Sequence, residues 1–329
     1  MEIKFTRAPF RNLPRAFFAA PCYAAGASIV AAILAWTAAG ASRADDISVS
    51  DTGGVVELKV DGKTILEYRS RPNPTKVYVS RWFTPKGTQI LRDSPHDHVH
   101  HHALMYAIGI DDVDFWSEGG TAKIGRQVPL GTSSSSATSN GKGQATIGQR
   151  LQWMAPDDVP LALESRSITV HLGVTPACSL LTWQCALEPA EGKSSVNLWG
   201  RHYFGWGVRF VTSMDKDGVF VFPGGGEERA VRGTEKLTRA PWCAYSAQAD
   251  GQPVTVAMFD APTNPRHPAT WFTMTGPFAY MAATLNLEAE PLSITKDQPL
   301  RARYGIAAWD GIADAAAVDA AYKAWLALD

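Results

Sequence analysis

The fold class follows from one stretch, Val55-Val56-Glu57-Leu58-Lys59-Val60-Asp61-Gly62-Lys63-Thr64-Ile65-Leu66-Glu67-Tyr68. On both sides of Asp61-Gly62 apolar and polar residues alternate, which is typical of strands that bury one face. Asp-Gly favours a two-residue hairpin turn, because glycine adopts a positive φ without steric cost. The stretch therefore predicts two antiparallel strands joined by a tight turn.

The same pattern of short alternating runs, each followed by turn residues, continues along the chain. Further strands are expected at 168–172, 219–222, 254–259 and 300–306. Alternating strand–helix units are missing, which disfavours a barrel of parallel strands or a dinucleotide-binding fold. We therefore expect an all-β protein, built as a large sandwich of antiparallel sheets.

Two segments depart from this pattern. Near the C-terminus Asp314 can cap a short helix, whose apolar face would carry Val318, Tyr322, Trp325 and Leu328. The serine-rich segment 131–146 has no apolar periodicity, so the sequence predicts a mobile loop there.

Residues 1–44 have the parts of a secretory signal peptide: a basic head, an apolar middle and small residues, Ser42 and Ala44, before a cleavage point. The alternative is an uncleaved membrane anchor, since the apolar run is long enough to cross a bilayer. Cleavage would leave residues 45–329, expected to form a single β-sandwich domain in the periplasm or outside the cell, with no membrane contact.

The charge of this mature chain argues against nucleic-acid binding. The whole chain has 31 Lys/Arg and 32 Asp/Glu; removing a leader with five basic and one acidic residue leaves a net charge of −5. A nucleic-acid binder normally has a basic face. Cys178, Cys185 and Cys243 would remain, and their spacing lacks a zinc-ribbon pattern, so we interpret them as structural. Cys178 and Cys185 are near enough in sequence to bridge a hairpin.

Five of the eight histidines lie within seven residues: His96, His98, His100, His101 and His102. Imidazole exchanges protons near neutral pH and binds metals when neutral, so this cluster indicates a site rather than a solvated turn. In an extended strand His98, His100 and His102 would share one face and His101 the other, beside small residues that leave room for a ligand.

A zinc site is one interpretation of the cluster, because His-x-His pairs suit zinc and His202 or His267 could supply further ligands. The run is similar to the His-x-His-x-Asp-His motif of binuclear zinc hydrolases. It lacks the aspartate at the fifth position, and the chain lacks the layered α/β pattern of those enzymes. The metal therefore stays an alternative.

Three other stretches, 113–120, 199–210 and 264–271, combine aromatic rings with charged and amide side chains. A sugar site needs this mixture, because rings stack on the C–H face of the sugar while polar groups bond its hydroxyls. The candidates for these contacts are Trp116, Arg209, Asn264, Arg266 and Trp271, and Glu118 is a candidate general base.

The chain resembles the bacterial family catalogued as methane oxygenase PmoA. The resemblance is carried by Asp97-His98-x-His100-His101, Val113-Asp114-Phe115-Trp116, the run 205–210 and Asn264-Pro265-Arg266-His267-Pro268 with Trp271. It covers nearly the whole mature chain. It implies a β-sandwich similar to galactose mutarotase and a carbohydrate ligand.

These observations favour a periplasmic carbohydrate-active enzyme that acts on a glycoside or oxidised sugar, as a lyase or hydrolase. His98 or His101 would be the acid or base and His202 or His267 its counterpart. Three alternatives remain: a sugar isomerase of the mutarotase or epimerase type, a non-catalytic sugar-binding module, and a zinc-dependent hydrolase. In each case the expected partner is a small-molecule or oligosaccharide substrate.

Overall fold

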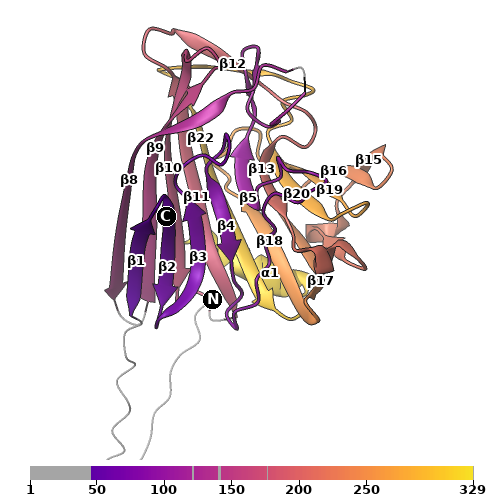
Figure 1. Cartoon of the computed structure of the whole chain (residues 1–329). Coiled ribbons are helices and arrows are strands. Elements are labelled where there is room, and N and C mark those ends of the chain that lie inside the picture. The colour runs from indigo at the N-terminus through magenta and orange to yellow at the C-terminus, as the bar shows by residue number, and fades with distance from the viewer. Residues whose placement is uncertain (1–45, 121, 140–141, 176, 329) are drawn as a thin grey trace, which may run out of the picture. The chain divides into compact units, whose positions relative to one another are not determined.

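The computed structural model describes residues 46–120, 122–139, 142–175 and 177–328. Antiparallel strands dominate this part of the chain, and they form three sheets (Figure 1). The prediction of an all-β protein with a large antiparallel sandwich and a short C-terminal helix is confirmed. The expected signal peptide, residues 1–44, lies outside the described residues.

The hairpin predicted at 55–68 forms as β2 (Val55–Val60) and β3 (Lys63–Arg69). Val60 pairs with Lys63, so the turn has two residues, and both have positive φ: 49° at Asp61 and 77° at Gly62. This is the turn whose twist matches the twist of paired strands. The buried positions of β2 alternate as expected for one face packed on a core.

The largest sheet has ten strands, and β2 and β3 belong to it. The order across this sheet is β1 (Ile47–Thr52), β2, β3, β4 (Tyr78–Trp82), β5 (Leu104–Ala107), β13 (Gly205–Arg209), β20 (Tyr280–Thr284), β19 (Thr270–Met274), β16 (Glu235–Arg239) and β15 (Glu228–Arg232).

The second sheet has eight strands, in the order β14 (Val219–Val221), β17 (Trp242–Ala249), β18 (Gln252–Asp260), β22 (Leu300–Asp310), β11 (Cys178–Pro189), β10 (Pro160–Leu172), β9 (Lys142–Met154) and β8 (Arg126–Ser139). A third sheet has the order β21 (Leu292–Thr295), β12 (Ser195–Trp199), β6 (Gly109–Ile110) and β7 (Val113–Asp114). Two short 3-10 helices, η1 (Thr212–Asp215) and η2 (Pro223–Gly225), follow β13 and β14.

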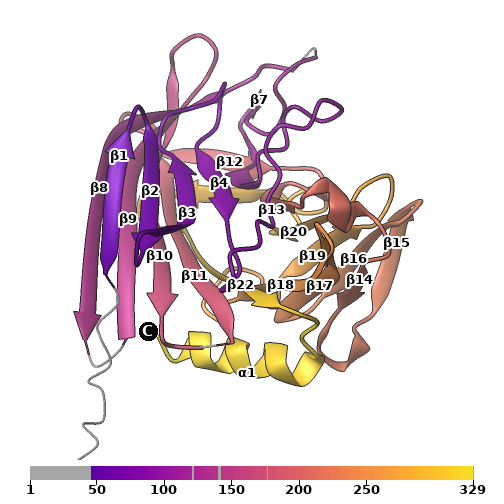
Figure 2. The same cartoon turned by 60° about the horizontal axis from the view of Figure 1, so that its bottom comes forward.

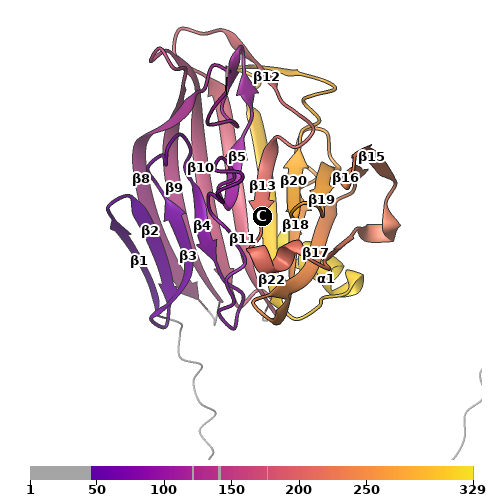
Figure 3. The same cartoon turned by 45° about the vertical axis from the view of Figure 1, so that its right-hand side comes forward.

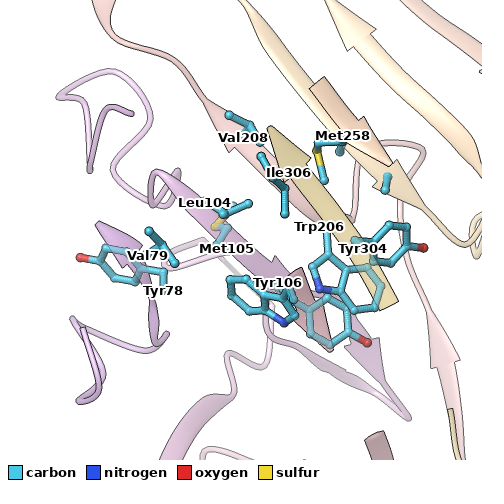
Figure 4. Packing of buried hydrophobic residues seen from close by; sticks show 14 of the residues in the cluster. Tyr78, Val79, Leu104, Met105, Tyr106, Trp206, Val208, Met258, Tyr304 and Ile306 are labelled. Atoms are coloured by element: carbon cyan, nitrogen blue, oxygen red, sulfur yellow. The ribbon is translucent and has the colours of Figure 1, made fainter. Parts of the chain in front are cut away.

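The core lies between the two large sheets. Figure 4 shows Tyr106 and Trp206 of the ten-stranded sheet beside Tyr304 of the eight-stranded sheet. The Tyr106 and Trp206 rings stack with centroids 3.8 Å apart, and Trp206 contacts Tyr304 at 4.5 Å. Large aromatic side chains stabilise such an interface through buried area and ring contacts together.

Helix α1 (Ala315–Leu326) begins where expected, with the Asp314 carboxylate accepting a hydrogen bond from the Ala317 N–H at 2.8 Å. Its face packs against Ala307 and Trp309 of β22, which belong to a different cluster from Ile306 and Ala308. Because side chains alternate along a strand, the helix covers the outer face of the eight-stranded sheet, beside β22 (Figure 2). Within the described chain, no helix is both long enough and apolar enough to cross a bilayer.

Two sequence expectations are wrong. The segment 131–146 is not a loop, because β8 and β9 pair through it in a long hairpin whose outer strand is exposed. Cys178 and Cys185 lie on the same strand, β11, and both are free thiols in the described structure. A strand separates such residues too far for a disulfide, which needs Cα atoms within about 7 Å.

Candidate functional site

The histidine cluster lies on an irregular loop, residues 93–102, that leads into β5. Its backbone turns twice: the His98 N–H donates to the Pro95 carbonyl and the His101 N–H to the His98 carbonyl, both at 2.9 Å. The alternation expected for an extended strand is therefore wrong. The turns bring the rings of His98, His100 and His101 together, while His102 bonds to other partners.

These three imidazoles line a cavity of about 340 Å³. The lining comes from the histidine loop, the loop carrying Trp116, strands β19 and β20 with their connection, the hairpin of β15 and β16, and the segment between β12 and β13. The lining residues are His98, His100, His101, Trp116, Tyr203, Arg232, Glu235, Phe272, Met274, Pro277, Phe278 and Tyr280.

His101 lies deepest of the three histidines, with only 6% of its surface exposed. Its ring stacks on Tyr280 at 5.1 Å, and its Nδ1 has no hydrogen-bond partner among the described residues. Burial, with nearby positive charge, lowers the pKa of His101 to about 2 and that of His100 to about 4. Both imidazoles are therefore neutral at neutral pH.

Trp116 is placed by a local turn. The Asp114 carboxylate accepts hydrogen bonds from the backbone N–H groups of Trp116, at 2.7 Å, and Ser117, at 3.0 Å. The indole ring then stacks on Phe204 with centroids 5.0 Å apart and meets His101 edge-on at 5.8 Å. The expectation that Trp116 belongs to the site agrees with its position in the cavity wall.

Two lining residues, Arg232 and Glu235, were not predicted from the sequence. Arg232 and Glu235 flank the two-residue turn between β15 and β16, where Gly233 has a φ of 57°. The Arg232 guanidinium donates to the Glu235 carboxylate at 2.7 Å. Glu235 is the one carboxylate among the described lining residues. No sequence pattern singles it out, because its role depends on strands far apart in the chain.

His202 borders the cavity without lining it. Its Nε2 lies 3.2 Å from Glu235, its Nδ1 lies 3.0 Å from Glu288, and its ring contacts Phe272 at 5.4 Å. His202 therefore lies next to the cavity, as predicted from the sequence, but it contacts the lining residue Glu235 and does not line the cavity itself.

Glu118 lies behind the cavity wall rather than in it. Its buried carboxylate accepts hydrogen bonds from Lys76 and Thr75, each at 2.7 Å, and lies 3.0 Å from His102. Burial opposes its ionisation, but the hydrogen bond from His102 and the charge of Lys76 outweigh burial and lower its pKa to about 2. So weak a base in a closed cluster does not fit the general-base role expected from the sequence.

Arg209 also fails to reach the cavity. Its guanidinium lies over the Phe278 ring, 3.7 Å from the centroid, and bonds the Ala279 carbonyl and the Asp215 carboxylate. Phe278 itself lines the cavity. The sequence predicted that Arg209 contacts a ligand. In the structure it packs against Phe278, a residue of the cavity wall, and does not line the cavity.

His267 lies elsewhere, so the expectation that it joins the cluster is wrong. Its Nδ1 bonds Asp260 at 2.7 Å, and it precedes β19, whose opposite end carries the cavity residue Met274. His267 is not among the residues that line the cavity. Asn264 belongs to the same cluster, bonding Asp260 at 2.7 Å and the backbone of Arg303.

The side chains of Arg266 and Trp271 bond to backbone carbonyls away from the cavity lining. The Arg266 guanidinium donates to the backbone carbonyls of Leu285 and Glu290. The Trp271 side chain is fully buried, and its Nε1–H donates to the Ala240 carbonyl at 2.7 Å. Neither residue lines the cavity, so the expected substrate contacts are not found there.

The histidine cluster does not have the geometry of a zinc site. His98 and His101 lie ring against ring, with centroids 4.8 Å apart and planes inclined at 30°, and His100 meets His101 edge-on at 4.6 Å. Zinc needs nitrogen atoms aimed at one point about 2 Å away. No group of three or more His, Cys, Asp or Glu side chains in the described ranges is placed to hold a metal ion.

The fold and the cavity define an all-β sandwich protein with a cavity lined mainly by histidines and aromatic rings. The chain belongs to the family of unknown function DUF6807, which matches residues 55–323. No curated protein matches the sequence.

Two solved structures are similar over most of the chain. HI1317 has 9% sequence identity and a TM-score of 0.35, with 80% of this chain and 99% of that chain covered. The Slr1438 protein from Synechocystis sp. PCC 6803 has 10% identity and a TM-score of 0.21, with 81% and 96% covered.

Proposed function

We propose that the protein is a periplasmic or secreted carbohydrate-active enzyme that transfers protons to and from a small saccharide in this cavity. One observation carries the proposal: the imidazoles of His98, His100 and His101 and one carboxylate, that of Glu235, are among the described residues that line a cavity of about 340 Å³ whose other walls are mainly aromatic. A volume of this size is at the lower end of small-molecule sites.

The aromatic walls suit a sugar ring. Trp116, Phe272 and Phe278 offer apolar surfaces to the C–H face of a sugar, while Glu235 and Arg232 can bond its hydroxyls. Such a division between stacking and hydrogen bonding is what orients a polar ring in a pocket.

Proton transfer needs an acid and a base within reach of the same substrate. Glu235 is the candidate base, because it is the one carboxylate among the described residues that line the cavity. His98 is the candidate acid, because its ring lines the cavity and its Nδ1 lies 3.2 Å from the Asp97 carboxylate. His101 stays neutral, so it fits a hydrogen-bonding role better than that of a proton donor.

The lining favours a lyase or an isomerase over a hydrolase. Most glycoside hydrolases use two carboxylates that flank the scissile bond. Glu235 has no second carboxylate beside it among the described lining residues. A lyase or an isomerase of the mutarotase or epimerase type needs only one base and one acid, and therefore fits better than a hydrolase.

A non-catalytic sugar-binding module is the second candidate, because aromatic walls alone would suffice for binding. Glu235→Gln and His98→Gln separate the two candidates. If the protein is an enzyme, each variant should lose at least about 100-fold in turnover, while its saccharide affinity stays within about tenfold of the wild type.

The assay would screen saccharides against the purified mature protein, following anomeric and C–H proton exchange by NMR and double-bond formation by ultraviolet absorbance. Glu67→Gln is the matched control, since Glu67 forms an exposed pair with Arg81 on β3 and β4. Binding without turnover of any saccharide by the wild type would favour the binding module. No saccharide binding would end the proposal. Elemental analysis of the same sample tests the zinc hydrolase.

A further inference from the structure

A buried ionic cluster contains His102 and Glu118, which follow the lining residues His101 and Trp116 in the chain, and the proposed chemistry does not use it. His102 is at its centre, with 1% of its side chain exposed. Its Nδ1 lies 2.8 Å from Asp93, and its Nε2 lies 3.0 and 3.1 Å from the two oxygens of Glu118. Lys76, also 1% exposed, donates to the same carboxylate at 2.7 Å.

The cluster joins two segments that form the cavity. Asp93 and His102 stand at the two ends of the histidine loop, where their backbones pair. Glu118 follows Trp116 by two residues on the second loop. His102 therefore ties the loop that presents His100 and His101 to the loop that presents Trp116.

Both ring nitrogens of His102 face carboxylate oxygens. A neutral imidazole has one N–H, so it can donate to only one of the two, and its other nitrogen would then point a lone pair at an anion. Only the imidazolium, with two N–H groups, satisfies both carboxylates at once. The observed arrangement is complete only when His102 is protonated.

We propose that His102 is a positioning residue whose proton fastens the histidine loop to the Trp116 loop and thereby sets the walls of the cavity. A buried ion cluster adds little to stability compared with well-packed apolar residues, which is consistent with a role in fixing one arrangement of the two loops.

The pH dependence follows from the surroundings of His102. Burial lowers its pKa, but the hydrogen bonds to Asp93 and Glu118 outweigh burial, so the pKa is raised overall. The fastening is therefore complete below the ordinary histidine pKa and is lost as pH rises through the raised value. The charged and titratable groups around the ring are Lys76, Tyr78, Asp93 and Glu118, with Arg69 beyond Asp93, Asp114 near Lys76, and His100 on the cavity side.

Lys76 titrates in the neighbouring range, because burial lowers its pKa to about 8 despite the charge of Glu118. Glu118, with a pKa of about 2, stays ionised throughout. Lys76→Met removes the lysine titration without changing the length of the side chain greatly. A pH step that persists in this variant belongs to His102.

Hydrogen exchange of the full mature chain, measured by mass spectrometry between pH 6 and pH 9, tests the proposal. After correction for intrinsic rates, peptides covering 93–103 and 114–120 should exchange at least about tenfold faster above the titration of His102, because a charge-assisted hydrogen bond is lost. The titration itself is followed by NMR of the imidazole. His102→Gln should exchange fast in both loops at every pH, with no step.

Asp260→Asn is the matched control, since it weakens another buried carboxylate–histidine pair, Asp260–His267, outside the cavity. It should leave both loops protected. Exchange that stays unchanged while His102 titrates in the wild type would overturn the proposal, and this result needs no variant to fold. Unchanged protection in His102→Gln would do the same.

The effect on catalysis rests on the proposed function, whereas the fastening is measured without a ligand. If the protein is the proposed enzyme, its KM should increase at pH values above the pKa of His102, with little change in kcat. A protein that binds no saccharide but shows the exchange step would refute the proposed function and leave the role of His102 intact.

Discussion

The imidazole of His101 lies against the phenol ring of Tyr280, with centroids 5.1 Å apart and planes inclined at 28°. Tyr280 also packs closely against Gly207 of β13: a Cβ built at Gly207 would lie 1.7 Å from the phenol oxygen. His101 thus packs on the Tyr280 ring, and this ring can occupy its position only because residue 207 has no side chain.

Gly207→Ala should therefore destabilise the protein by about 3 kcal/mol, because the added methyl group would overlap the buried Tyr280 ring. Adding Tyr280→Phe should restore part of this loss, since the hydroxyl is the nearest atom. Urea unfolding measures both. Gly131→Ala on β8, where nothing lies within 4 Å, is the control and should change stability by less than about 0.5 kcal/mol. A similar loss in both alanine variants would contradict the seating of Tyr280.

Acid should weaken the fold through His101. Its folded pKa of about 2 lies far below that of an unfolded histidine, so between these values only the unfolded chain takes up the proton. Stability is then lost as pH falls below the ordinary histidine value, by about 2 kcal/mol from this residue between pH 7 and pH 5.

Urea unfolding of the wild type and of His101→Phe at the two pH values isolates this contribution. The phenylalanine keeps a ring against Tyr280 but cannot titrate, so its stability should fall less between pH 7 and pH 5. Equal losses in both proteins would show that His101 is not buried in neutral form.

Phe278→Leu should weaken two properties at once. It removes the ring under the Arg209 guanidinium, at a cost of about 1 kcal/mol, and it removes an aromatic wall from the cavity, so saccharide affinity should fall roughly tenfold. Phe83→Leu is the control, because Phe83 also lies under an arginine, Arg81 at 4.9 Å, but does not line the cavity. Calorimetry measures both quantities, and saccharide affinity that falls equally in both variants would argue against stacking on Phe278.

The leader expected at residues 1–44 predicts a mature protein that begins at Asp45. Expression of the full chain in a Gram-negative host, followed by fractionation and mass spectrometry, should find this N-terminus in the periplasmic fraction. An intact N-terminus in the membrane fraction would instead support the uncleaved anchor.

Local patterns were sufficient to predict several strands and the terminal helix. The hairpin at 55–68 and the cap at Asp314 form as expected, because turn geometry and capping depend on neighbouring residues. The serine-rich segment was misjudged because the exposed outer strand β8 has no buried face to create a period (Figure 3). Pairing with β9, rather than its own side chains, makes it a strand.

The candidate site was predicted only in part. The sequence points to His98, His101 and Trp116, since unusual clusters of reactive and aromatic residues are visible locally. Glu235 could not be found in this way, because its place in the cavity depends on the order β20-β19-β16-β15 in the large sheet. The same long-range order removes His267 from the site, although its surroundings in sequence are as rich as those of the residues that line it.

The turn that carries Glu235 and Arg232 joins the last two strands of the ten-stranded sheet, and β15 pairs with β16 alone. A change in the length or composition of this hairpin alters one side of the pocket without disturbing any strand further in. Residues 233–234 can therefore be replaced to reshape the side of the cavity that carries Glu235 and Arg232, while the histidine loop keeps its own sequence.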